Sequence, residues 1–147
     1  MLSKKTLVPM LLVLIGCASG KYTELTGVFD VIESVSFPMS ALSDQDVAAY
    51  VGKQVIIKNG QAVFNGDTCL ITKIKSDTVS TEECLGQVRT EIEKKIQTKL
   101  PSTIIGMSLY CNGKFWEKFP NYFFCVNANI YLSVSEGVVF ILKRNSR

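Results

Sequence analysis

The sequence predicts an α+β fold, mainly β, in which an antiparallel meander closes into a small barrel or sandwich with one short and one long helix. Two Asn-Gly pairs, Asn59-Gly60 and Asn112-Gly113, each stand between short runs rich in β-branched and aromatic residues. Such pairs supply the positive φ angles of a type I′ turn and are typical of β-hairpins. A stretch with helical periodicity, residues 81–100, separates the two predicted hairpins.

The first half of the expected domain begins with a strand and a short helix. Residues 28–37 mix apolar and polar side chains in partial alternation and predict the first strand. Ser43 followed by Asp46 is a helix start signal, and the short helix that reaches Tyr50 is expected to plug one end of the sheet. Three further strands are predicted at residues 54–58, 61–64 and 68–74.

The stretch 81–100 predicts one amphipathic helix, irregular in its first turn at Gly86 and ended by Pro101. Its aliphatic side chains recur at spacings of three and four, which is typical of a helix packed on its own sheet and less often of one that meets a membrane or a partner. These side chains are Leu85, Val88, Ile92, Ile96 and Leu100. The last third of the chain predicts strands at 103–111, 114–119, 122–126, 130–134 and 138–143.

The N-terminal residues 1–16 read as a signal peptide, with Lys4 and Lys5 followed by an apolar run that is too short to span a bilayer. The run ends in Leu14-Ile15-Gly16-Cys17. This segment resembles the lipobox of bacterial lipoproteins, in which the cysteine thiol takes a diacylglyceryl group and becomes the new N-terminus. The resemblance implies lipidation at Cys17, a tether over 17–26 and a single β-rich domain over 27–147.

Ala18 follows the cysteine where inner-membrane retention would call for Asp, so the resemblance implies an outer membrane location facing the periplasm. Two or three acyl chains would give the durable attachment that one chain cannot. The alternative is ordinary secretory cleavage after Ala18-Ser19-Gly20, which would release a soluble periplasmic protein.

Four cysteines remain once Cys17 is assigned to lipid, and an even number in an oxidising compartment predicts two disulfides. Three pairings are possible, and the favoured one joins Cys69 to Cys111 and Cys84 to Cys125. The separations do not form CxxC pairs, and the chain contains no histidine, so neither a zinc site nor an activated catalytic thiol is expected.

Six aromatic residues gather between Phe115 and Phe124, and consecutive Tyr122-Phe123-Phe124 must place rings on both faces of a strand. A buried core is the more common explanation of such a run, and a partner-binding surface is the alternative. In either case at least one ring needs cover from the helix or from a partner. The candidate partner-binding residues are Trp116, Phe119, Tyr122 and Phe124.

Charge and motifs exclude several functions. The 16 basic residues fall to about 14 against 13 acidic ones after loss of the leader, and no basic cluster marks a nucleic-acid interface. The acids Asp44, Asp46, Asp67, Asp77, Glu82, Glu83, Glu117 and Glu136 are scattered at expected caps and turns. The sequence lacks phosphate-binding loops and serine-nucleophile motifs and gives no reason to expect a cofactor or a metal.

The two ends of the domain carry a second likeness. Gly27-Val28-Phe29 opens the first strand, and Lys143-Arg144 closes the last one. This pattern resembles lipocalin-type barrels, which have Gly, any residue and Trp at the first position and often an Arg packed over that Trp at the second. Phe29 stands here in place of Trp, and the likeness covers these two ends alone.

Together these features predict a non-enzymatic, lipid-anchored interaction protein of the cell envelope, such as an inhibitor, an immunity protein or an assembly factor. Its partner would be an envelope protein or a small apolar ligand. The alternatives are carriage of an apolar ligand inside a barrel, which needs an open interior, and a carboxylate-dependent hydrolase, which needs two acids about 5–10 Å apart in a cleft.

Overall fold

The computed structural model describes residues 25–145 of the chain. The expected signal peptide 1–16, Cys17 and the tether up to residue 24 lie outside the described residues. Within the described part the chain is an α+β fold, mainly β, which confirms the predicted fold class. Its helices are α2 (Asp44–Ala48), α3 (Thr81–Leu85) and α4 (Arg89–Ile96).

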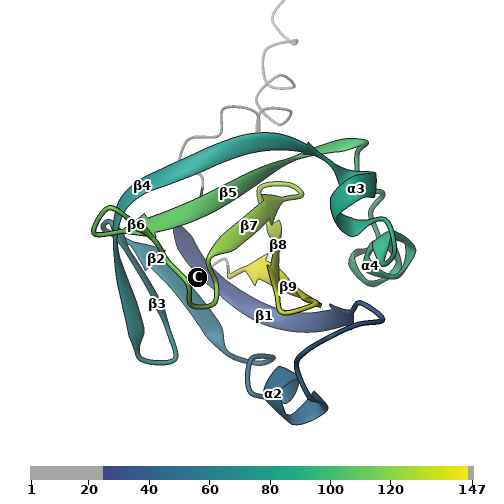
Figure 1. The fold of residues 1–147 in the computed structure, drawn as a ribbon, viewed down its shortest axis with the longest axis horizontal. Helices are drawn as coiled ribbons and strands as arrows, with labels where there is room; N and C mark the ends of the chain where they lie inside the picture. The colour runs from purple at the N-terminus through teal and green to yellow at the C-terminus, as the bar shows by residue number, and fades with distance from the viewer. Residues whose placement is uncertain (1–24, 146–147) are drawn as a thin grey trace, which may run out of the picture.

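Nine antiparallel strands make one sheet, which closes into a ring because β4 bonds to both β3 and β5 (Figure 1). The strands follow one another around the ring in chain order, β6 excepted, so the predicted meander is confirmed. β6 pairs with β5 at the edge. The strands are β1 (Gly27–Ser36), β2 (Gln54–Lys58), β3 (Gln61–Phe64), β4 (Asp67–Ser80), β5 (Thr103–Cys111), β6 (Lys114–Phe115), β7 (Tyr122–Cys125), β8 (Ile130–Ser135) and β9 (Val138–Arg144).

Alternate residues of the strands feed two separate apolar clusters. In β9, Val138, Phe140 and Leu142 point into the ring, whereas Val139 and Ile141 point out under the helices. Because successive side chains of a strand face opposite ways, an uninterrupted apolar run such as β9 must be covered on both faces. The ring interior supplies one cover, and α3 with α4 supplies the other.

The predicted single helix over 81–100 is wrong. The chain forms α3, turns at Gly86, and restarts as α4, which ends at a left-handed Gln97 before Pro101 is reached. Leu85, Val88 and Ile92 are nevertheless buried on one face, as the spacing predicted. A carbon at the Cβ position of Gly86 would lie 2.8 Å from the Glu82 carboxylate, so glycine permits this tight turn.

Two other elements differ in length from their predictions. β4 continues six residues past Ile74 to Ser80, because this stretch pairs with β5 over its whole length. β6 covers two residues where a strand to Phe119 was expected. The short helix α2 has the predicted capping box, in which Ser43 and Asp46 each accept a bond from the other's backbone N–H.

The first and last strands of the sheet lie side by side. β1 pairs with β9, and the Arg144 guanidinium lies 4.7 Å from the centroid of the Phe29 ring. Arg144 also donates from Nε to the carbonyl of Ala128 at 2.8 Å and from Nη1 to the carbonyl of Thr26. A side chain at Gly27 would collide with this guanidinium. The φ angle of +151° at this position also favours glycine.

Candidate functional site

The predicted aromatic surface is for the most part buried. Trp116 and Phe119 lie in the cluster inside the ring, and Phe124 lies in the outer cluster beneath the helices. These three residues are therefore core residues, and the prediction that they form a partner-binding surface is wrong. Tyr122 is half-buried against Phe124, at 5.0 Å between ring centroids, so the cover that the aromatic run required comes from the helical segment.

Aromatic rings plug one end of the ring of strands. Tyr50, just after α2, stacks on Phe119 at 4.8 Å between centroids and also contacts Phe64 and Phe140. Phe119 contacts Phe64 and Phe140 in turn at 4.9 and 5.0 Å. The segment carrying α2 therefore fills this end, as the sequence predicted for the short helix.

A hollow of about 270 Å³ lies over this plug. The β3–β4 turn, the loop after β6 and the β8–β9 turn surround it, and Tyr50, Phe64 and Phe119 form its apolar wall. Asp67, Glu117, Lys118 and Glu136 contribute the charges, and Lys118 Nζ pairs with Asp67 Oδ1 at 3.0 Å. The hollow is thus lined by three carboxylates and one ammonium group.

Asp67, Glu117 and Glu136 are the only ones of the scattered acids that the fold brings to this hollow. Glu136 sits at φ +48° in a tight turn, where its side chain is exposed. Within residues 25–145, no group of three or more acidic or cysteine side chains is placed to hold a metal ion.

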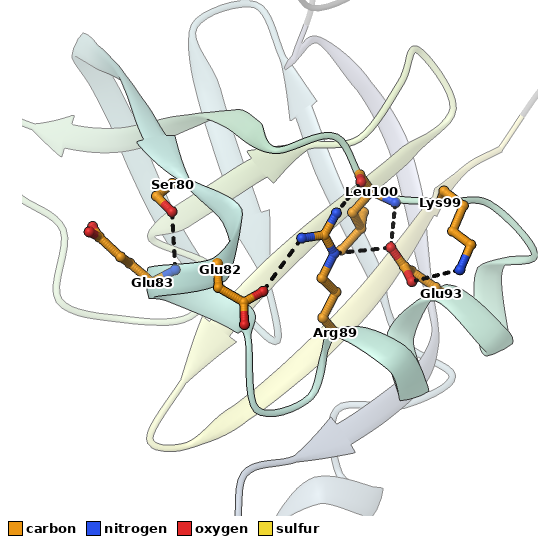
Figure 2. Close-up of polar contacts among 7 residues, drawn as sticks. All are labelled: Ser80, Glu82, Glu83, Arg89, Glu93, Lys99 and Leu100. Carbon is orange, nitrogen blue, oxygen red and sulfur yellow. Dashed lines mark hydrogen bonds and ion pairs between the residues drawn. The ribbon is translucent and has the colours of Figure 1, made fainter.

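A second polar site lies along α4 and is shown in Figure 2. Arg89 pairs with Glu93 at 3.1 Å and with Glu82 at 3.5 Å, and it donates to the carbonyl of Leu100. Glu93 Oε2 accepts the backbone N–H of Leu100 at 2.8 Å, and Oε1 lies 3.7 Å from Lys99 Nζ.

These contacts explain the titration of Glu93. The bond from the Leu100 backbone lowers the pKa of the Glu93 carboxyl below its ordinary value of 4.5, with further help from Arg89 and Lys99 against partial burial. These contacts tie α3 and α4 to the chain segment that leads into β5. A shallow hollow of about 360 Å³ beside it is lined by α4 and by residues 97–99.

Only one of the two predicted disulfides is present in the structure. Cys69 and Cys111 form a disulfide between β4 and β5, with their Cα atoms 5.3 Å apart, and this prediction is confirmed. Cys84 is a free thiol, so the predicted Cys84–Cys125 bond is wrong. Cys84 lies on α3, whereas Cys125 is disulfide-bonded to a partner other than Cys84.

Sequence reasoning missed two features of the surface. The hollow over the aromatic plug combines residues from four segments, and no spacing along the chain links Tyr50 to Glu117 or Glu136. The other is a strip on the outside of the ring where Leu70 and Phe115 are 52% and 43% exposed. Leu70 had a signal, because it follows the inward-facing Cys69 in a strand and must face outward.

Comparison with known proteins gives no match. No protein-family model matches the chain, and neither the curated proteins nor the solved structures contain a significant match. In the part of the chain that the structure describes, none of the helices has the length and hydrophobicity needed to span a bilayer.

Proposed function

We propose that this protein is a lipid-anchored, non-enzymatic protein of the cell envelope, which acts by binding another envelope component at its surface. The observation that carries the binding mode is the plugged end of the strand ring. Tyr50, Phe64 and Phe119 pack together at that end, and buried side chains such as Phe29, Met107 and Phe123 fill the interior. Binding is therefore assigned to the outside of the domain.

The anchor is proposed from the lipobox resemblance of Leu14-Ile15-Gly16-Cys17, with an outer membrane location facing the periplasm. A Cys69–Cys111 disulfide supports export, because disulfides persist in oxidising compartments and are rare in the cytosol. The anchor would keep the domain at high local concentration beside its membrane partners.

The hollow over the aromatic plug is the proposed contact for a partner. Its three carboxylates against one lysine favour a positively charged group, and its aromatic wall offers apolar and cation–π contact. A protruding Lys or Arg side chain of an envelope protein has this chemistry. Charge reversal at Glu117 and Glu136, both exposed, should weaken that contact without disturbing the fold.

Carriage of a small apolar ligand is the second candidate, and the Arg144 contact with Phe29 favours it because this contact accompanies the lipocalin-type likeness. A carrier should bind an apolar fluorescent dye saturably at one site, and Met107→Trp, which fills the interior, should abolish that binding. The proposed surface function predicts no saturable dye binding in either protein.

The anchor is tested by expressing the full precursor in a bacterial host that is fed labelled palmitate. The wild-type chain should incorporate label and partition into the membrane fraction. Cys17→Ser should lose both properties, whereas the matched control Cys84→Ser should keep both. Equal labelling of the wild type and Cys17→Ser would overturn the anchor.

A further inference from the structure

One part of the strand ring is left uncovered by the described helices. α3 and α4 lie together at the right of Figure 1, whereas β2, β3 and β6 lie at the left, where no helix covers them. Two of the four exposed large apolar side chains of the described residues, Leu70 and Phe115, project here. The name basic face is used below for the exposed residues Lys58, Leu70, Lys73, Lys75 and Phe115 together with half-buried Tyr110.

Strand register brings these side chains into rows. Lys58 pairs with Gln61, which pairs with Leu70, so one exposed row crosses β2, β3 and β4. Lys73 pairs with Tyr110, which pairs with Phe115, so a second row crosses β4, β5 and β6. The Lys73 ammonium lies 5.6 Å from the Tyr110 ring centroid, and that ring contacts Phe115 at 5.9 Å.

Lysines outnumber acids on this face, where exposed Asp77 lies on the same side of β4 as Lys73 and Lys75. β2, β3, β5 and β6 contain no acidic residue, and the two acids of β4 are Asp67 and Asp77. Asp67 already pairs with Lys118. Among the described residues no ion pair neutralises the lysines of the basic face, Lys58, Lys73 and Lys75.

The chain enters the domain beside this face. Leu25 is buried, and β1 begins at Gly27, which pairs with Ile57, the neighbour of Lys58. Leu70 is three strands further round the ring, which at the usual strand spacing is about 14 Å. Seven residues, 18–24, separate Cys17 from Leu25. Such a tether is short enough to hold this side of the domain near the anchored end of the chain.

We propose that the basic face rests on the surface of an anionic phospholipid bilayer, so that the anchored domain has a fixed orientation. This inference depends on the anchor proposed above. The basic face alone binds a bilayer weakly, and the anchor keeps it at a high local concentration beside the membrane. Each lysine near an anionic surface contributes about 1 kcal/mol. Leu70 and Phe115 add apolar contact at the boundary between headgroups and acyl chains.

The orientation has a consequence for the proposed partner contact. The hollow over the aromatic plug belongs to the turns around Asn65, Glu117 and Glu136, and its net charge is opposite to that of the basic face. An anionic bilayer attracts the lysines and repels these carboxylates. The hollow is thereby kept away from the membrane and presented to a cationic group of another protein.

Lysine footprinting of the full mature protein tests the orientation. The protein is purified from membranes of a host that expresses the full precursor. It is then placed in vesicles of phosphatidylcholine alone or in vesicles that also contain about 30% phosphatidylglycerol, an anionic lipid. An amine-reactive reagent is added, and modification at each lysine is quantified by mass spectrometry. Lys94, which is exposed on α4, is the internal control.

Modification of Lys58, Lys73 and Lys75 should fall at least about threefold in the anionic vesicles, while that of Lys94 stays constant. The double variant Lys73→Glu/Lys75→Glu should remain in the vesicles and lose protection at Lys58. The matched variant Lys94→Glu/Lys143→Glu, whose sites are exposed elsewhere, should keep that protection.

Three outcomes separate the two proposals. Protection that depends on anionic lipid supports the basic face as the membrane contact. Protein that stays in the vesicles with equal modification in both lipid mixtures overturns the basic face and leaves the anchor standing. Protein that does not stay in either kind of vesicle overturns the anchor and, with it, the orientation.

Discussion

Arg144 joins the two ends of the strand ring through its guanidinium. It stacks on Phe29, lies 5.9 Å from the Tyr131 ring, and donates to carbonyls before β1 and before β8. A planar guanidinium serves all of these contacts at once, which an ammonium group cannot do. Arg144 therefore contributes stability through geometry as much as through charge.

Replacement of Arg144 by lysine should lower the free energy of unfolding by about 1–2 kcal/mol, because the stacking and the divided hydrogen bonds are lost while the charge stays. Urea unfolding followed by tryptophan fluorescence measures the change. Lys143→Arg, at the exposed neighbouring position, is the control and should be neutral. An unchanged midpoint for Arg144→Lys would show that the contact is not stabilising.

Gly106 is fixed by the ring that covers it. A Cβ at this position would lie 2.6 Å from Tyr122 Cζ and 2.9 Å from Cε1, so any side chain must displace the tyrosine. Burial raises the pKa of the Tyr122 hydroxyl, with smaller contributions from Cys84 and Asp77, which agrees with a ring enclosed beneath the helical segment.

Gly106→Ala should destabilise the fold by about 1–3 kcal/mol through overpacking. Tyr122→Leu in the same chain should recover part of this loss, because the clash is removed. The coupling free energy from the four unfolding measurements should therefore be favourable and clearly different from zero. If the two substitutions changed the free energy of unfolding additively, the clash would not be with Tyr122.

At the scale of elements, strands were easier to predict than helices. The Asn-Gly pairs predicted both hairpins, because a tight hairpin turn requires positive φ angles and Asn and Gly adopt them readily. The break at Gly86 was not predicted as a break, because the aliphatic spacing of Leu85, Val88 and Ile92 continues through it. Periodicity records which side chains face the sheet, and two short helices can keep the same face as one long helix.

Glu93 connects the second of these helices to β5, and its lowered pKa makes the connection sensitive to acid. Its folded-state pKa lies below the unfolded value, so the stabilisation is present above about pH 4.5 and is lost as the pH falls through the folded-state pKa. Glu93→Gln should be less stable than the wild type at pH 7, and the difference should shrink towards pH 3.

Unfolding midpoints at pH 7 and pH 3 measure this linkage, and Glu91→Gln, an exposed position on α4, is the control. Glu91→Gln should follow the wild type at both pH values. A gap between Glu93→Gln and the wild type that stays constant with pH would contradict an ionised, hydrogen-bonded Glu93.

At the scale of the whole molecule, the Cys69–Cys111 bond closes a 42-residue separation that contains most of β4, both outer helices and all of β5. Such a crosslink restricts the unfolded chain. Cys69→Ala/Cys111→Ala should therefore lower the free energy of unfolding by about 2–4 kcal/mol. Cys84→Ser, which removes the free thiol, should change it much less.

The fold class followed from the sequence, and the site followed only in part. Runs such as β9 reveal two covered faces, but they do not say which aromatic residues between 115 and 124 are covered by which cluster. Trp116 and Phe119 proved to be interior because the loop after β6 folds over the end of the ring. The hollow and the basic face depend on register between distant strands, and no local pattern contains that register.

The central claim is that Cys17 carries the lipid that holds this domain at a membrane. The most direct measurement is the intact mass of the protein purified in detergent from membranes of its own host, before and after reduction. We expect the mass of residues 17–147 plus acyl chains, with a rise of two hydrogens on reduction for each disulfide that the protein contains. A mass without lipid that begins at Lys21 would contradict the anchor.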